Sequence, residues 1–203
     1  MTCSFLFTQA GGKWYNVETG RRDGLVSFAS EAVAGLPGPT MPVNIAIQEH
    51  AKRNSTAEDF VILLGGGHTV GFIHCSFFQD RLYNFQNTGK PDPVMNQTTL
   101  SSLQKTCPRI GGLNNIVAAD QTPGSAMIVD NGFFKAIVAR KGLLRIDQQI
   151  AIDPLTKSIV AKLASSGDFA LKFGPAMVKL GRVGVLTGMQ GQIRKSCRAI
   201  NII

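Results

Sequence analysis

Apolar residues recur at helical spacing in several parts of the chain, and this pattern predicts a mainly α-helical protein with long loops. Ile159, Val160 and Leu163, for example, fall on one face of a helix that we expect to open at Asp153-Pro154. The same reasoning predicts helices over residues 43–52, about 98–105, 133–141 and 168–180. Loops are expected over the glycine- and proline-rich residues 35–43, the turn-rich residues 84–99, and residues 109–127.

Local signals predict where several of these helices begin and end. Ser55-Thr56-Ala57-Glu58 has the pattern of a capping box, in which Ser55 caps the helix and Glu58 answers it three residues later. The apolar run 60–64 is expected to stop at the three glycines 65–67. Gly142 is expected to end the helix over 133–141, and Pro175 is expected to bend the last helix.

Composition adds a basic charge to an otherwise ordinary globular chain. The chain has 203 residues, of which 44% are hydrophobic and 17% charged, and its net charge is +8. This length suffices for a real hydrophobic core. The charge makes a polyanion partner conceivable, but no dense basic stripe interleaves with aromatic residues, which argues against a nucleic-acid-binding module. No apolar run approaches the ~20 residues of a membrane-spanning helix.

The N-terminus and the cysteines predict neither a signal peptide nor a zinc ribbon. The first eight residues lack the basic and long apolar regions of a secretory signal, so none is expected. The four cysteines, Cys3, Cys75, Cys107 and Cys197, include no C-x-x-C pair.

Among the histidines, His68 is the strongest functional candidate. It follows three glycines, and so bare a backbone would let a flat cofactor or ligand approach closely. The glycines match neither the phosphate-binding G-x-x-x-x-G-K-[ST] loop nor G-x-G-x-x-G. Zinc bound by His68, His74 and Cys75 would lack a fourth ligand. No G-x-S-x-G motif indicates a hydrolase.

Three aspartates also suggest chemistry. Asp120 and Asp130 flank a turn that carries the hydroxyl groups of Thr122 and Ser125, and such hard oxygen ligands suit calcium, although a solvated loop is the simpler interpretation. Asp147 has apolar neighbours, so a partly buried carboxylate there needs a partner. That partner is either a backbone N–H or a histidine.

A series of motifs then resembles one family. In order they are Thr19-Gly20-Arg21-Arg22-Asp23-Gly24, Gly66-Gly67-His68-Thr69-Val70-Gly71, His74-Cys75, Asp80-Arg81-Leu82-Tyr83-Asn84-Phe85, Pro91-Asp92-Pro93, Asp130-Asn131, Lys141-Gly142-Leu143-Leu144, Asp147-Gln148, Ala176-Met177-Val178-Lys179, Leu186-Thr187-Gly188, Gly191-Gln192-Ile193-Arg194 and Cys197-Arg198. This order, from about Gly11 to Asn201, resembles the plant secretory (class III) haem peroxidases.

The resemblance implies roles for residues around the cofactor. His68 matches the axial ligand of the haem iron, and Asp147 matches the carboxylate that accepts the other N–H of that histidine. Pro37 matches a residue lining the channel for aromatic donors. Cys75 and Cys107 match a disulfide pair.

The resemblance also implies a calcium site. Its ligands would be Thr69, Asp120, Ser125 and Asp130, with Thr122 as the alternative hydroxyl ligand.

One part of the family pattern is missing. No Arg-x-x-x-His motif of the distal haem pocket occurs in the sequence, and His50 does not match it. We therefore expect the haem-peroxidase helical fold without most of its distal N-terminal lobe, in an N-terminally truncated chain. Residues 1–10 would be a divergent N-terminal segment and residues 11–201 the proximal domain. Cys197, whose partner would lie in the missing part, is expected to be unpaired.

These observations lead to three hypotheses. First, the chain belongs to a secreted, monomeric enzyme of the cell wall, extracellular space or vacuole that uses haem b and calcium. Such an enzyme removes hydrogen peroxide under oxidative stress by oxidising phenolic donors, although this chain lacks the distal Arg and His. Second, the chain is a non-enzymatic, basic helical module that binds acidic cell-wall polysaccharide through its +8 charge. Third, the chain does not fold stably.

Overall fold

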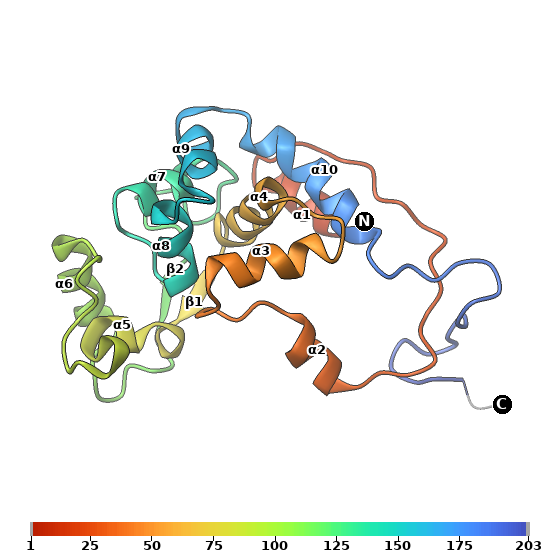
Figure 1. Ribbon diagram of the computed structural model, residues 1–203, viewed down its shortest axis with the longest axis horizontal. Helices are drawn as coiled ribbons and strands as arrows, with labels where there is room; N and C mark the ends of the chain where they lie inside the picture. Colours follow the sequence, from red (N-terminus) through yellow and green to blue (C-terminus); the bar gives the residue numbers. More distant parts are fainter. Residues whose placement is uncertain (1, 202–203) are drawn as a thin grey trace.

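The computed structural model describes residues 2–201, apart from the side chains of residues 2–4, 33 and 34, and confirms a mainly α-helical fold (Figure 1). The helices are α1 (Thr2–Gln9), α2 (Ala29–Gly35), α3 (Val43–Ala51), α4 (Ala57–His68), α5 (Gln79–Tyr83), α6 (Gln97–Thr106), α7 (Gly132–Val138), α8 (Arg145–Ile152), α9 (Lys157–Ser165) and α10 (Phe169–Gly181). Two 3₁₀ turns, η1 (Cys75–Phe77) and η2 (Phe85–Asn87), flank α5. Among these residues, no helix is both long and apolar enough to span a bilayer.

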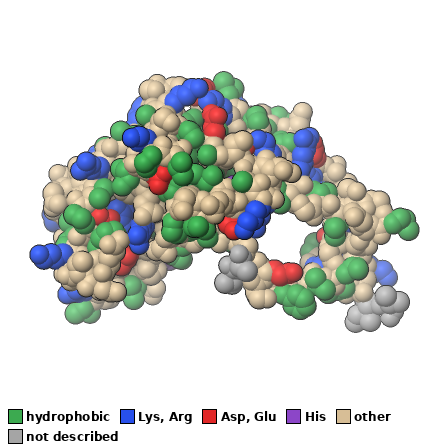
Figure 2. Space-filling model, viewed as in Figure 1, with side chains coloured by type: hydrophobic (Ala, Val, Ile, Leu, Met, Phe, Trp, Pro, Cys, Tyr) green, Lys and Arg blue, Asp and Glu red, His purple; other side chains and the backbone are tan. Residues whose placement is uncertain are grey.

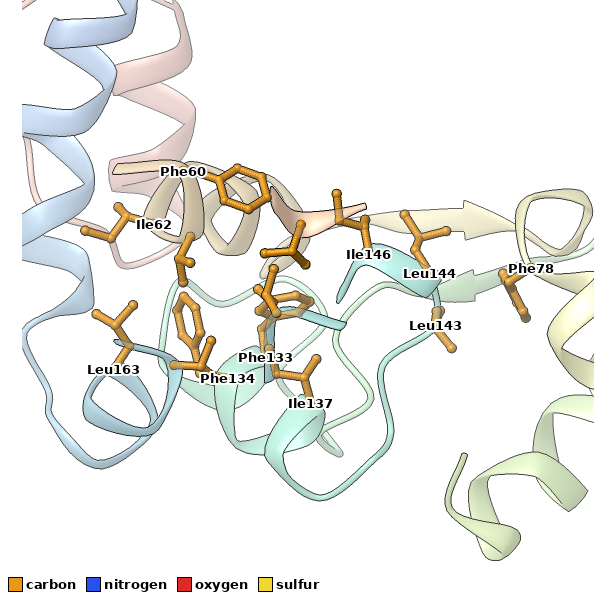
Figure 3. Packing of buried hydrophobic residues seen from close by; sticks show 14 of the residues in the cluster. Phe60, Ile62, Phe78, Phe133, Phe134, Ile137, Leu143, Leu144, Ile146 and Leu163 are labelled. Carbon is orange, nitrogen blue, oxygen red and sulfur yellow. The ribbon is translucent and has the colours of Figure 1, made fainter. Parts of the chain in front are cut away.

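The hydrophobic core forms around α4. Helices α3, α7, α9 and α10 pack against α4, and α8 packs against both α7 and α9. Phe60 of α4 and Phe133 and Phe134 of α7 are all fully or almost fully buried. Figure 3 shows these rings between α4, α7 and α9, with Leu163 closing one end of the cluster. We call α3, α4 and α7–α10 the helical body.

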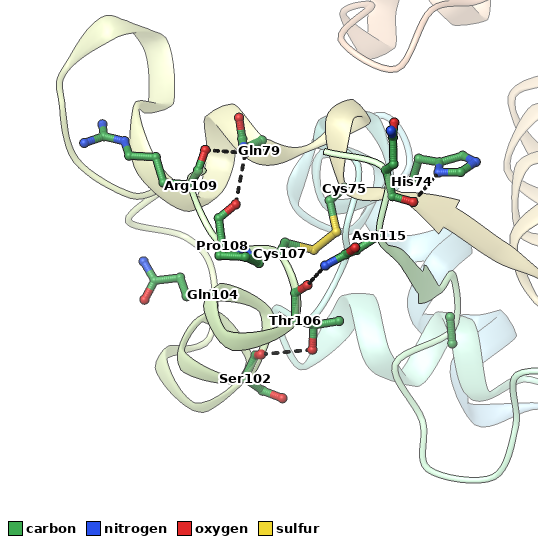
Figure 4. Close-up of a disulfide and its surroundings, with 12 residues drawn as sticks. His74, Cys75, Gln79, Ser102, Gln104, Thr106, Cys107, Pro108, Arg109 and Asn115 are labelled. Atoms are coloured by element: carbon green, nitrogen blue, oxygen red, sulfur yellow. Dashed lines mark hydrogen bonds between the residues drawn. A yellow bond between two sulfur atoms is a disulfide. The ribbon is translucent and has the colours of Figure 1, made fainter. Parts of the chain in front are cut away.

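Residues 75–115, which include α5 and α6, form a second, smaller unit that carries the predicted disulfide. Cys75, in η1, is bonded to Cys107 at the end of α6, so the predicted pairing is confirmed (Figure 4). Two short antiparallel strands, β1 (Phe72–His74) and β2 (Ile116–Ala118), connect this unit to the helical body. The sequence placed β2 inside a loop, which is wrong; three residues are too few to show an alternating pattern.

Several predicted helix boundaries need correction. Thr56 and Asp59 form the capping box of α4, one residue later than the predicted Ser55 and Glu58. Helix α4 continues through the three glycines to His68 instead of stopping before them. The predicted helix 133–141 ends at Val138, and the helix expected at Asp153-Pro154 begins at Lys157. Helices α1, α2, α5 and α8 were not predicted.

Other predicted elements hold. Helices α3 and α6 coincide within one or two residues with the predicted 43–52 and 98–105, and α10 with 168–180. Helix α10 runs without a break through Pro175.

The two ends of the chain pair with each other beside the body. Residues 21–24, within the segment 13–36, lie beside residues 181–194, whereas α2 lies apart from the C-terminal segment (Figure 1), and Figure 2 shows an opening between these segments and the helical body. Arg22 bridges to Leu186 and Asp23 to Gln192. We call residues 13–36 and 182–201 the terminal arm. Its apolar side chains are largely uncovered: Leu25 is 60% exposed and Phe28 62%.

Candidate functional site

His68 is the last residue of α4, and packing explains two of the three glycines before it. A Cβ atom at Gly65 would collide with the ring of Phe134, and one at Gly66 with the ring of Phe173. A Cβ atom at Gly67 would meet nothing within 4 Å. Two of the glycines therefore admit aromatic rings from α7 and α10. The open backbone that the sequence suggested for a ligand is limited to Gly67.

His68 is paired with Asp147. The sequence left a histidine and a backbone N–H open as partners of this carboxylate, and both contact it. His68 Nδ1 lies 2.9 Å from Asp147 Oδ1. Leu144 N donates to Asp147 Oδ2 at 3.3 Å, so this one carboxylate has both a histidine and a backbone N–H as partners. Asp147 is completely buried at the start of α8. The pair joins α4 to α8 through two residues that are 79 positions apart in the sequence.

The pairing decides which nitrogen of His68 is available to a ligand. A carboxylate accepts hydrogen bonds, so Nδ1 carries a proton and donates a hydrogen bond to Asp147. In the neutral imidazole Nε2 then has a free lone pair, and it has no hydrogen-bond partner in the part of the chain that is described. Burial lowers the pKa of His68, but the charge of Asp147 and the hydrogen bond to it raise this pKa, and the net shift is upward.

A cavity of about 320 Å³ lies beside His68. It is lined by Pro37, Gly38, Pro39, Leu64, His68, Phe72, Ile73, His74, Phe77, Leu144 and Ile146, and we call it the His68 cavity. Ile146 N donates to the carbonyl of Pro39 at 3.1 Å, which attaches the Pro37 loop to the start of α8. The structure thus brings together Pro37, His68 and the helix that carries Asp147. Most of the lining is apolar, as a flat, largely apolar cofactor requires.

A larger hollow of about 640 Å³ lies elsewhere, between Trp14 and α10. Its charged groups are paired, Arg182 with Glu18 and Lys179 with Asp59, so they are not free to bind a ligand. The smaller His68 cavity is the better functional candidate, because it is lined by His68, whose Nε2 has no hydrogen-bond partner among the described residues.

The predicted calcium residues also converge. A Cβ atom at Gly132 would meet Asp120 Oδ2 at 2.6 Å, Ser125 Oγ at 2.7 Å and Asp130 Oδ1 at 2.8 Å, so these three oxygens surround one point. Thr69 Oγ1 lies against the same loop, donating to the carbonyls of Ile128 and Asp130 at 3.2 and 3.3 Å. This arrangement is a cradle of hard oxygen atoms.

One oxygen of this cradle lacks a partner. Asp120 Oδ2 is buried without a hydrogen bond among the described residues. Burial raises the pKa of Asp120, and the charge of Asp130 raises it further. A bound cation would relieve both costs, so the residues fit calcium. No group of three or more His, Cys, Asp or Glu side chains gathers anywhere in the described chain, so the remaining ligands would be hydroxyl and carbonyl oxygens.

The two candidate hydroxyl ligands point in different directions. Ser125 Oγ donates to Asp130 Oδ2 at 2.7 Å, inside the cradle. Thr122 Oγ1 donates to the carbonyl of Gly132 at 3.0 Å instead. The geometry favours Ser125.

The remaining histidines and Cys197 take no part in the His68–Asp147 hydrogen bond. The ring of His50 packs on Phe60 of α4, with 5.0 Å between the ring centres, and burial lowers its pKa. His74 Nδ1 is 3.0 Å from the carbonyl of Asn114. Cys197 is exposed and unpaired among the described residues, as expected, whereas the side chain of Cys3 lies outside them.

Comparison with known proteins gives one consistent result. A family model described as Peroxidase matches residues 3–166. Peroxidase 60 and Peroxidase 57 of Arabidopsis thaliana are each 44% identical to the chain, over 94% and 95% of its length. Peroxidase C2 of Armoracia rusticana is 37% identical over 95% of the chain. The chain spans 57%, 59% and 56% of these three relatives, respectively.

Proposed function

The chain belongs to the peroxidase family, and from this premise we propose that it forms the haem-binding, proximal side of an enzyme that reduces hydrogen peroxide and oxidises phenolic donors. The observation that carries the proposal is the His68–Asp147 pair, which uses Nδ1 of a histidine that lines an apolar cavity. Haem b, when bound, would supply the redox-active iron on which peroxide is reduced.

The chain's own residues would hold the haem and adjust its properties. His68 Nε2 is the candidate iron ligand. Asp147, by accepting the Nδ1 proton, fixes the orientation of the ring and raises the electron density that the imidazole can give to iron. Leu144 and Ile146 would exclude water from that face, and Pro37 would border the edge at which a phenolic donor approaches.

Thr69, Asp120, Ser125 and Asp130 are the proposed calcium ligands. The unpartnered Asp120 oxygen supports this proposal. Ser125 is preferred to Thr122 because the Ser125 hydroxyl bonds to Asp130, whereas the Thr122 hydroxyl bonds to the carbonyl of Gly132. Thr69 directly follows His68, so an occupied calcium site would restrain the end of α4 on which the histidine stands.

The proposal includes a location outside the cell, in the wall, or in the vacuole. The Cys75–Cys107 disulfide supports it, since disulfides persist in oxidising compartments. The sequence contains no Arg-x-x-x-His motif to move protons on peroxide, and a positioned acid–base group contributes typically ~10²–10⁴-fold to a rate. We therefore expect haem binding by this chain to be easier to detect than peroxide turnover.

Haem titration of the full 203-residue chain tests the proposal. We expect a Soret band typical of histidine-ligated iron, which is lost in His68→Ala and kept in His50→Ala, the same change at a histidine outside the cavity. Asp147→Asn is expected to weaken haem binding about 10–100-fold, the usual effect of removing a partner of a metal-ligating histidine. Absence of the band in the unmodified chain, or its survival in His68→Ala, would contradict the proposal. The basic polysaccharide-binding module would then be the better hypothesis.

A further inference from the structure

Arg81, on the short helix α5, is a buried cation whose hydrogen bonds reach the segment that leads into α8. Its side chain is 1% exposed. Nε donates to Asp92 Oδ2 at 2.9 Å, and the side chain of Asp92 is 4% exposed. Nη1 lies 2.7, 2.7 and 3.0 Å from the carbonyl oxygens of Gly142, Leu143 and Leu144. One guanidinium group therefore joins α5 to three successive residues that are about 60 positions away in the sequence.

The segment held by Arg81 is the one that positions Asp147. Helix α8 begins at Arg145, directly after Leu144. The N–H of Leu144 donates to Asp147 Oδ2, and the other oxygen of this carboxylate accepts from His68. A shift of residues 142–144 would therefore move the N–H that holds Asp147, and the carboxylate would turn away from the imidazole.

Other contacts hold the N–H groups of this segment, but not its first carbonyls. Gly142 N donates to Gln148 Oε1 at 3.2 Å, and Ile146 N to the carbonyl of Pro39. The carbonyls of Gly142 and Leu143 accept hydrogen bonds only from Arg81 among the described residues. Arg81 is thus the group that fixes the carbonyl side of the turn.

Arginine suits this task for chemical reasons. Its planar guanidinium keeps its charge and presents five donors in a rigid fork, so it can bind a carboxylate on one edge and carbonyls on another. Lysine has the same charge at a single flexible point and cannot span both partners in a fixed geometry. A buried ion pair adds little net stability, since desolvation offsets the attraction, so its effect on geometry is the more informative property.

We propose that Arg81, anchored by Asp92, is a positioning residue for the His68–Asp147 hydrogen bond. Its significance for catalysis rests on the proposed function, because only a metal-ligating His68 makes the orientation of Asp147 matter for chemistry. The positional effect itself belongs to the chain without any ligand, and it can be measured there.

The first test measures how fast the Nδ1 proton of His68 exchanges with water, by NMR of the full chain labelled with ¹⁵N-histidine. We expect Arg81→Lys to accelerate this exchange about tenfold, since a weaker hydrogen bond to a charged acceptor protects the proton less. The matched control is Leu82→Val, at the neighbouring buried residue of α5. It should reduce stability without changing the exchange rate at His68.

A second variant keeps the test decisive if Arg81→Lys does not fold. Asp92→Asn retains the guanidinium but weakens its anchor, and we expect exchange about threefold faster than in the unmodified chain. A folded variant with unchanged exchange at His68 would overturn the proposal, and so would equal acceleration in Leu82→Val. In haem-loaded chain, Arg81→Lys should also lower the iron–histidine stretching frequency in resonance Raman spectra. Failure of the chain to bind haem would remove only this last measurement, so the two proposals fail separately.

Discussion

The helical body and the terminal arm are stabilised in different ways. In the body, the rings of Phe133 and Phe134 are buried against each other, and Phe60 is buried in the same hydrophobic cluster. In the arm, Leu25 and Phe28 are mostly exposed, and the contacts that join its two segments are polar, such as Arg194 Nη2 to the carbonyl of Gly24 at 2.9 Å. Arg182 and Glu18 form an exposed ion pair there.

This difference concerns function because the His68–Asp147 pair belongs to the body and no residue of the terminal arm lines the His68 cavity. His68 and Asp147 come from α4 and α8, which are held by the buried cluster. A side chain that must keep a histidine within hydrogen-bonding distance needs such a rigid support. The Pro37 loop, which follows the arm in the sequence, also lines the cavity, and it is attached to α8 by the hydrogen bond from Ile146 N to the carbonyl of Pro39.

The largest expected contrast between the two regions comes from matched phenylalanine substitutions. Phe134→Ala, at a fully buried ring, should lower the free energy of unfolding by about 3–5 kcal/mol through lost burial and a cavity. Phe28→Ala in the arm should change it by no more than about 0.5 kcal/mol, as for ordinary surface positions. Urea-induced unfolding followed by circular dichroism measures both. Equal effects would mean that Phe28 is buried in solution and that the contrast is wrong.

The cysteines give the next contrast. Replacing Cys75 and Cys107 together by serine should cost about 3–4 kcal/mol, because the bond closes a loop of 32 positions and restricts the unfolded chain. Cys197→Ser, at the exposed and unpaired cysteine of the arm, should leave thermal unfolding unchanged. A large effect of Cys197→Ser would contradict its assignment as a free cysteine.

The smallest contrast is one of pH dependence. Burial raises the pKa of Asp59, but hydrogen bonds from Lys179 and Thr56 lower it more, and the net pKa lies below the usual aspartate value. Its ionised form therefore stabilises the fold above the unfolded pKa of about 3.9, and this contribution is lost as the pH falls through the lower folded value. Asp59→Asn should flatten the acid-side loss of stability between about pH 5 and pH 2.

Glu18→Gln in the arm is the control for that measurement. The hydrogen bond from Arg182 lowers the pKa of Glu18 as well, but its side chain is 43% exposed and water screens the pair, so Glu18→Gln should change the acid-side curve less than Asp59→Asn. If Glu18→Gln flattened the curve as much as Asp59→Asn, the body and arm would not differ in this respect.

Much of the fold could be predicted because its signals are local. Helices α3, α6 and α10 follow from apolar spacing, which needs no knowledge of distant residues. The resemblance supplied the Cys75–Cys107 pairing and the pairing of His68 with Asp147. The residues alone left a backbone N–H and a histidine open as partners of Asp147, and the carboxylate has both.

The errors arose where distant residues decide the local structure. Glycines 65–67 have low helix propensity, yet α4 continues through them to His68, and Phe134 and Phe173 pack where side chains at Gly65 and Gly66 would lie. The capping box was predicted at Ser55 and Glu58, but Thr56 and Asp59 form it, and Asp59 is also bound by Lys179, a partner 120 positions away that the local pattern does not show. Arg81 gave no signal of its own, because its partners at residues 142–144 are close only in the folded chain.

The pairing of the two ends within the arm has a consequence for how the protein is made. Arg22 Nε bonds to the carbonyl of Gln190, 168 positions further along the chain. During synthesis, residues 13–36 therefore leave the ribosome long before their partners have been translated, while the body can already assemble behind them. Closing so long a loop is also the slow, entropically costly part of folding. Leu25 and Phe28 are still 60% and 62% exposed once the two segments have paired, so completing the arm does not bury them and they stay accessible to a chaperone before and after the ends meet.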